Sequence, residues 1–234
     1  MGALPAPRAG IGGRRCLRTA APSVSEPFAM STETSLRPFV GRVLLLLPFA
    51  FALWYVTAAW HLAPVVWLSD LILRSWMPEA VADLRLQGGA LLLVTHFGEV
   101  AGRLVADPPP GENLGFLSNP LSYSYSLPVF AALALATPGP REWWRLLAGL
   151  AILTLVAVAS MLATLLKTLA FDVGPVFVAQ QQWGALARNG AAMAYQFGSL
   201  LLPMVTPVVL WLALYRGYLA ELAPGIASRW RGAR

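Results

Sequence analysis

The chain has 234 residues, of which 57% are hydrophobic and only 12% charged, and its mean hydropathy is +0.62. Soluble domains contain about 45–50% apolar and about 25% charged residues, so this composition excludes an ordinary soluble fold and predicts a single membrane domain. The formal net charge is +6, but the arginines flank apolar runs, which is typical of membrane topology and excludes nucleic acid as a partner.

The N-terminal segment is rich in Ala, Pro, Gly, Arg and Ser without apolar periodicity, so residues 1–35 are expected to form a disordered leader. Met30 opens a new polar segment within it. Two interpretations stay open: translation starts at Met30 and the residues before it are an upstream extension, or the leader is a genuine basic tail. The membrane domain is expected over residues 36–220 and a basic cytoplasmic tail over residues 221–234.

Four apolar runs predict four transmembrane helices, because each is close to the roughly 20 residues that a helix needs to cross a bilayer. They lie at about residues 39–62, 119–136, 146–169 and 190–215. Pro48 lies inside the first run, where neighbouring helices can satisfy the backbone groups that proline frees.

Between the first two runs, residues 64–118 are expected to form an extracytoplasmic insertion. Residues 64–77 mix Trp and Leu with charged residues such as Asp70, which favours a helix lying on the membrane surface. Two extended runs then flank Gly88-Gly89, a pattern typical of a β-hairpin with a two-residue turn. An isolated hairpin is marginally stable in water, so it should pack against this helix, the membrane or a partner. The predicted fold is an all-α polytopic membrane protein with this small insertion.

Basic residues indicate the orientation. The segments proposed to lie inside, residues 1–42, 138–145 and 216–234, hold 12 of the 17 Lys and Arg residues, whereas residues 69–118 and 167–189 hold five. Cytoplasmic segments carry an excess of Lys and Arg, so both termini are expected in the cytoplasm and the hairpin outside.

No pattern of a nucleophile, an acid–base pair or metal ligands is evident. The single cysteine, Cys16, lies in the leader, and the two histidines, His61 and His96, are 35 residues apart. His96 with Glu99 is an alternative metal or catalytic pair, although surface hydrogen bonding is the favoured role. We therefore expect no enzyme activity, no cofactor and no bound metal.

Two segments are candidates for packing or for contact with a partner. The first is residues 119–128, which place hydroxyl groups at nearly every position where the second span begins. Hydrogen bonds of such side chains between membrane helices contribute about 0.6 kcal/mol each on average. An interfacial cap and a docking surface for another membrane protein are equally open interpretations. The candidate residues are Asn119, Pro120, Tyr123, Tyr125 and Pro128.

The second segment lies in the last span, where small residues recur every four positions and line one helix face. This face serves internal packing or a partner helix. Gln196 is expected to face protein, because its amide needs a hydrogen bond within hydrocarbon. The candidate residues are Gly190, Ala194, Tyr195, Gln196, Gly198, Pro203 and Pro207.

The two segments resemble a known family. Asn119-Pro120-Leu121-x-Tyr123-x-Tyr125-x-Leu127-Pro128, and Ala194-Tyr195-Gln196-Phe197-Gly198 followed by the two prolines, are similar to the exosortase H-associated membrane proteins. The resemblance covers about residues 38–216. Ser126 stands where a glycine is expected, and Ser199 where an aromatic residue is expected.

The resemblance implies a place in a sorting system of the bacterial inner membrane. There, exosortases, which are polytopic cysteine transpeptidases, process the C-terminal sorting tails of exported proteins. Because this chain has no cysteine in its spans, the resemblance favours a non-catalytic accessory subunit that contacts membrane lipid and an exosortase. The alternative is a transporter-like protein that handles a small solute or lipid, with Gln196 and the hydroxyls of the second span lining the path.

Overall fold

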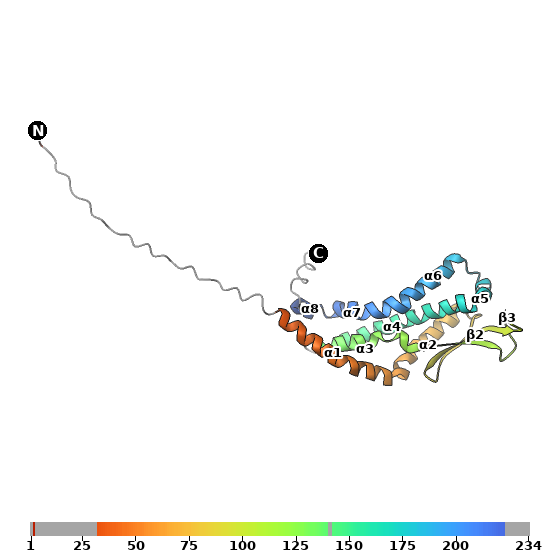
Figure 1. Cartoon of the computed structure of the whole chain (residues 1–234), viewed down its shortest axis with the longest axis horizontal. Helices are drawn as coiled ribbons and strands as arrows, with labels where there is room; N and C mark the ends of the chain where they lie inside the picture. Colours follow the sequence, from red (N-terminus) through yellow and green to blue (C-terminus); the bar gives the residue numbers. More distant parts are fainter. Residues whose placement is uncertain (1, 3–31, 140–141, 223–234) are drawn as a thin grey trace.

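The structure, a computed structural model, describes residue 2 and residues 32–139 and 142–222. It is an elongated helical bundle with a small β-sheet at one end (Figure 1). The helices are α1 (Thr32–Val56), α2 (Ala58–Trp76), α3 (Ser126–Ala136), α4 (Trp143–Lys167), α5 (Pro175–Gln180), α6 (Ala185–Gln196), α7 (Leu202–Leu214) and α8 (Arg216–Leu222). Three short irregular helices join them: η1 (Pro120–Tyr123), η2 (Thr168–Val173) and η3 (Phe197–Leu201).

The predicted ends of the chain fall mostly outside the described residues. The leader and the question of a start at Met30 lie there, as does nearly all of the predicted tail over residues 221–234. Helix α1 begins at Thr32, four residues before the predicted start of the membrane domain.

Three helical stretches are long and apolar enough to cross a membrane, and they coincide with three of the four predicted spans. They are Leu36–Val56, Trp143–Val173 and Ala185–Leu214, with 21, 31 and 30 residues. At 1.5 Å per residue the first is about 31 Å long, which matches the hydrocarbon core of about 30 Å. The other two are about 45 Å long, so they exceed that thickness by about 15 Å.

The second predicted span, residues 119–136, is not confirmed as a crossing. Helix α3 has 11 residues and is about 16 Å long, roughly half of the hydrocarbon core. The side chain of Asn119 accepts a hydrogen bond from the N–H of Leu121 and starts the 3₁₀ turn η1. The hydroxyl-rich residues that the sequence placed in a span therefore form a turn, because short polar side chains compete for backbone groups.

The first span and the helix after it meet at a bend at Thr57. The sequence placed the end of the span at residue 62, but α1 ends at Val56 and α2 starts at Ala58. The Thr57 hydroxyl donates to the carbonyl of Leu53 at 2.7 Å. From this bend α2 runs toward the sheet, away from the axis of α1 (Figure 1).

The predicted hairpin is confirmed and is part of a larger sheet. Strands β1 (Val81–Gln87) and β2 (Ala90–Val100) pair antiparallel around Gly88-Gly89, whose φ angles of 59° and 86° suit a type I′ turn. On its other side β2 pairs with β3 (Arg103–Ala106) and β4 (Asn113–Ser118), which the sequence analysis missed. Both are short, and β3 follows a tight turn that has no strong sequence signal.

Two hydrophobic cores hold the bundle. One joins α2, the sheet, α5 and the half of α4 near the sheet, around Leu73, Phe97 and Phe177. The other joins α1, α3, α7 and the first half of α4, around Phe130 and Leu153. The hairpin therefore packs on α2, which confirms one of the three contacts expected for it.

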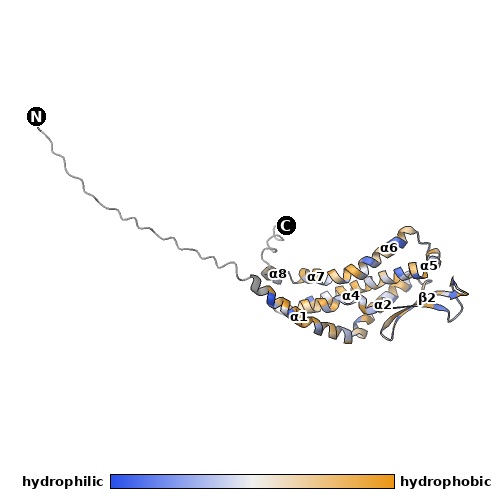
Figure 2. Cartoon of the chain, viewed as in Figure 1, coloured by the Kyte–Doolittle hydropathy of each residue, from blue (hydrophilic) through white to orange (hydrophobic). Residues whose placement is uncertain are grey.

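The bundle separates the polar segments into two groups. The start of α1, the turn after α3 and helix α8 lie at one end, and the sheet and α5 lie at the other (Figure 1). The residues between are mostly apolar along α1, α4 and α7, whereas α6 includes hydrophilic positions (Figure 2).

Candidate functional site

The first predicted segment lies where α1, α2 and η1 meet. The indole Nε1 of Trp54 donates to the Ser124 hydroxyl at 3.1 Å, and Ser124 Oγ lies 3.4 Å from His61 Nε2. His61 Nδ1 lies 3.0 Å from the carbonyl oxygen of Thr57. A carbonyl only accepts, so Nδ1 carries the hydrogen and Nε2 accepts from Ser124. The bonds form a chain with one direction, from Trp54 through Ser124 and His61 to Thr57.

This series of hydrogen bonds lies inside the protein. Ser124 is fully buried, and Trp54 and His61 stack with ring centroids 6.0 Å apart. Burial lowers the pKa of His61, while its bond to the Thr57 carbonyl opposes that shift, so the ring is neutral at pH 7. A partly buried neutral network of this kind joins helices. Sequence analysis missed it, because 63 residues separate His61 from Ser124.

The five candidates of this segment pack mainly inside the chain. Pro120, Tyr123 and Pro128 are buried, Tyr125 is half-buried, and Asn119 is exposed while it caps η1. This placement favours an internal cap over a docking surface.

The small residues of the second segment divide between two environments. A Cβ atom added to Gly198 would lie 3.0 Å from the Cβ of Ala163 in α4, so this glycine allows the two helices to approach closely. Gly190 has nothing within 4 Å of such an atom, and Ala194 is exposed. The stripe therefore supports an internal contact at one end and faces outward at the other.

The remaining candidates mark a break between α6 and α7. Pro203 and Pro207 are buried, and η3 precedes them as a π-helical turn. The carbonyl of Tyr195 accepts a bond of 2.6 Å from the Ser199 hydroxyl. Gln196, expected to face protein, is exposed. That expectation is wrong for contacts within the described residues, because Gln196 lies on the side of the helix that the rest of the described chain leaves exposed.

One face of α6 and η3 is exposed and largely apolar. Its residues are spaced at 4, 7, 8 and 11 positions, which places them on one side of a helix. Of α6 itself only Ala191 is buried, whereas Leu186 is 88% exposed. We call this surface the α6 face, and its residues are Leu186, Gly190, Met193, Ala194 and Phe197.

Metal binding finds no support in the part of the chain that the structure describes. Within residues 32–139 and 142–222, no group of three or more His, Cys, Asp or Glu side chains could hold an ion. Of the alternative pair His96 and Glu99, the first is half-buried and the second exposed on β2.

Comparison with known proteins gives one match. A family model described as exosortase H-associated membrane protein matches residues 33–218. Neither the curated proteins nor the solved structures include a match. The matched range contains every described transmembrane helix, the sheet and the α6 face.

Proposed function

Because the chain belongs to the exosortase H-associated membrane proteins, we propose that it is a non-catalytic accessory subunit of an exosortase-type system. In this role it stabilises the enzyme, or presents the C-terminal sorting tail of an exported protein, in the bacterial inner membrane. The observation that best supports a partner is the α6 face, an apolar surface with no cover from the rest of the described chain.

From the helix lengths we infer that the α6 face lies at the edge of the membrane. A core of about 30 Å corresponds to about 20 residues of helix, counted back from Leu214 at the end of α7. Such a count reaches the region of Gln196. The part of α6 before this residue, with exposed Arg188 and Asn189, then lies outside the hydrocarbon on the side of the sheet.

This depth changes the significance of the exposed apolar side chains. Within hydrocarbon, lipid would cover Leu186 and Met193 at no cost. Outside it, a contiguous apolar surface is a mark of a protein interface. Gly190 and Ala194 leave room for the backbone of a partner helix, and Gln196 beside them offers it a hydrogen bond.

The orientation in this proposal is cytoplasmic for both termini and extracytoplasmic for the sheet. Support comes from the excess of Lys and Arg in residues 1–42, 138–145 and 216–234, whose described parts lie toward the end opposite the sheet. A periplasmic reporter fused after Asp107 should be active, and one fused after Gly139 inactive. The reverse pattern would overturn the orientation.

The interface is tested by site-specific photo-crosslinking in cells that contain the exosortase. A crosslinking amino acid at Met193 should capture the polytopic transpeptidase. The same group at Leu117 of β4, an apolar position away from α6 that is exposed to 70% against 59% for Met193, should not. Equal capture at both positions, or unchanged tail processing after deletion of the gene, would contradict the proposal.

A second variant separates folding from binding. Gly190→Leu adds a bulky side chain where nothing lies within 4 Å, so the chain itself should fold normally. The same side chain would block close approach of a partner helix. We expect normal amounts of Gly190→Leu in the membrane, with loss of exosortase co-purification.

The alternative role in solute or lipid handling receives less support. It requires Gln196 and the hydroxyls of residues 119–128 to line one path. Gln196 is exposed on the outer side of α6, whereas Ser124 is buried beside α1 and α2. Flux through liposomes that disappears in Gln196→Leu would restore this alternative.

A further inference from the structure

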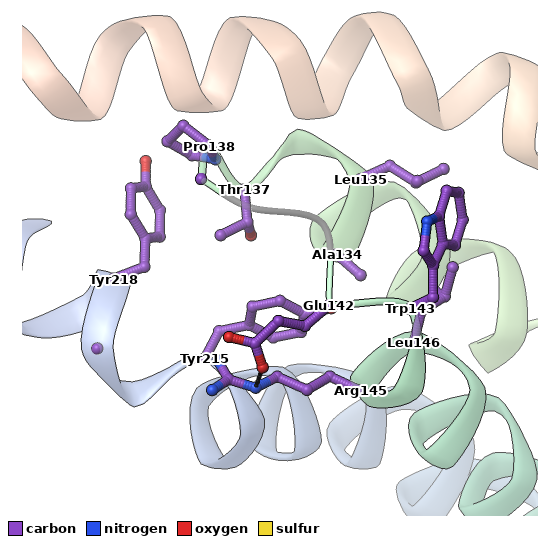
Figure 3. A pocket seen from close by; sticks show the side chains of 12 residues that line it. Ala134, Leu135, Thr137, Pro138, Glu142, Trp143, Arg145, Leu146, Tyr215 and Tyr218 are labelled. Carbon is purple, nitrogen blue, oxygen red and sulfur yellow. Dashed lines mark ion pairs between the residues drawn. The ribbon is translucent and has the colours of Figure 1, made fainter.

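A pocket of about 340 Å³, drawn in Figure 3, lies between the end of α3, the start of α4 and the junction of α7 with α8, which are at the end of the bundle opposite the sheet (Figure 1). The end of α3 and the turn after it form one wall, and the start of α4 and the junction of α7 with α8 form the others. Its volume is at the lower end of the range for ligand sites, about 300–1,000 Å³, so it suits a headgroup-sized molecule. The residues that matter here are Leu135, Glu142, Arg145, Leu146, Tyr215 and Tyr218.

One wall of the pocket carries a charge of each sign. Arg145 Nε pairs with Glu142 Oε2 at 2.5 Å, and both side chains are partly exposed, at 30% and 37%. The guanidinium has five N–H donors, so its terminal nitrogens can still donate beyond this bond. Figure 3 shows the guanidinium extending past Glu142 toward Tyr215. Glu142 Oε2 also accepts a hydrogen bond of 3.1 Å from the indole Nε1 of Trp144. A carboxylate accepts up to four bonds, so Glu142 keeps capacity beyond these two.

The tyrosines supply the other polar groups. The guanidinium carbon of Arg145 lies 5.9 Å from the centroid of the Tyr215 ring. Burial raises the pKa of Tyr215, and this effect is the largest. The charge of Arg145 lowers that pKa and the charge of Glu142 raises it. Because the net shift is upward, the hydroxyl stays protonated and can donate. Among the lining residues that the structure describes, the pocket therefore offers hydrogen-bond donors and a carboxylate acceptor, and the formal charges of Arg145 and Glu142 cancel.

The position of the pocket points to lipid. It lies at the start of α4, a helix of membrane-spanning length, beside the exposed rings of Trp143 and Trp144. Tryptophan favours the headgroup layer of a bilayer. Leu135 and Leu146 provide apolar lining next to the charged pair, as an amphipathic ligand at this depth requires.

We propose that this pocket binds the zwitterionic headgroup of an aminophospholipid, of the phosphatidylethanolamine type. The lipid phosphate accepts hydrogen bonds from Arg145 and the Tyr215 hydroxyl, and the lipid ammonium donates to Glu142. Because the charges of Arg145 and Glu142 cancel, the pocket selects a neutral headgroup over an anionic one. The site is independent of the exosortase contact, because it lies at the opposite end of the bundle from the α6 face.

Native mass spectrometry of the full chain tests the proposal. The protein is released from nanodiscs that contain equal parts of ethanolamine, choline and glycerol phospholipids. The ethanolamine lipid should be retained about fivefold over the choline lipid, whose quaternary amine donates no N–H bond to Glu142. Arg145→Gln and Glu142→Gln should each abolish this preference, and Arg145→Lys should keep part of it. Arg216→Gln, an exposed cation of α8 outside the pocket lining, is the matched control.

Three outcomes would overturn the proposal: equal retention of the three lipids, preference for the anionic glycerol lipid, or an unchanged preference in both Arg145→Gln and Glu142→Gln. Addition of free phosphoethanolamine distinguishes the source of the headgroup. Failure to displace the lipid supports a bilayer ligand, and displacement at low millimolar concentration would assign the pocket to a soluble zwitterion. A normal elution profile and thermal midpoint of each variant exclude misfolding as the cause of lost retention.

Discussion

The carboxylate of Asp70 in α2 accepts a hydrogen bond from the backbone N–H of Leu84 in β1, with 3.1 Å between Oδ1 and the nitrogen. Its other oxygen pairs with Arg74 at 2.5 Å. The Asp70 side chain is only 13% exposed and Leu84 is buried, so water does not readily replace this bond. The Asp70 carboxylate thus adds a directional bond to the hydrophobic core that packs the sheet on α2, the helix that connects the sheet to the first span.

Loss of this carboxylate should loosen the sheet. In Asp70→Ala the Leu84 N–H is left buried without its acceptor, at a cost of about 1–3 kcal/mol. Amide hydrogen exchange of β1 should therefore accelerate in nanodiscs. Asp70→Asn keeps an acceptor oxygen and should have a smaller effect.

The matched control for Asp70→Ala is Asp83→Ala. Asp83 pairs with Arg85 at 3.3 Å on the surface, and such exposed pairs contribute about 0–1 kcal/mol. Exchange of β1 that accelerates equally in Asp83→Ala and Asp70→Ala would show that the bond to Leu84 does not hold the sheet.

The network at His61 predicts a pH dependence of stability. His61 lies in α2, beyond the end of the first span, and burial lowers its pKa below the ordinary value of about 6.5. The unfolded chain therefore binds the proton more readily than the folded chain. Stability from the neutral ring is present above about pH 6.5 and is lost as the pH falls below that value. The thermal midpoint should decrease between pH 7.5 and pH 5.5.

His61→Gln provides the matched control. Its amide oxygen can still accept from Ser124, but it does not titrate, so the decrease of the midpoint below pH 6.5 should become shallower. The same pH dependence in this variant and in the unsubstituted chain would mean that other groups cause it.

Local patterns predicted the fold well where neighbours in sequence decide the structure. Gly88-Gly89 predicted its turn because only the two glycines adopt the required φ angles easily. Contacts between distant residues were not predictable in this way. The bond from Trp54 to Ser124 spans 70 residues, and nothing in the sequence near either residue indicates it. Helix α3 was overestimated because hydropathy does not reveal where a 3₁₀ turn replaces a helix.

Thr137 and Trp211 should be coupled in stability. Trp211 Nε1 donates to Thr137 Oγ1 at 2.9 Å, and its ring stacks on Phe39 with centroids 5.3 Å apart. Trp211→Phe and Thr137→Val each remove the hydrogen bond and retain most of the packing. A double-mutant cycle should give a coupling of about 0.6 kcal/mol, the average for side-chain bonds between membrane helices. Additive effects of the two substitutions would show that the bond contributes nothing measurable.

Two glycines provide the clearest contrast between sequence pattern and structure. Gly190 was singled out by its spacing, yet a Cβ atom there would meet nothing within 4 Å. Gly149 in α4 lies in no small-residue pattern that we identified, yet a Cβ atom there would overlap the ring of Phe130 in α3. Phe130 is fully buried, so its ring cannot swing out into solvent to make room. Gly149 is therefore the glycine on which the packing of α3 against α4 depends.

Substitution of each glycine by alanine tests this assignment. Gly149→Ala should destabilise the folded chain by about 1–3 kcal/mol, the usual cost of overpacking a core. Gly190→Ala should be neutral or more stable by up to about 1 kcal/mol, because alanine favours helix more than glycine does. The thermal midpoint in detergent measures both. Phe130→Leu combined with Gly149→Ala should recover much of the loss, because the smaller side chain makes room for the new methyl group. A Gly149→Ala midpoint equal to that of Gly190→Ala would mean that α3 and α4 are not in close contact at this position.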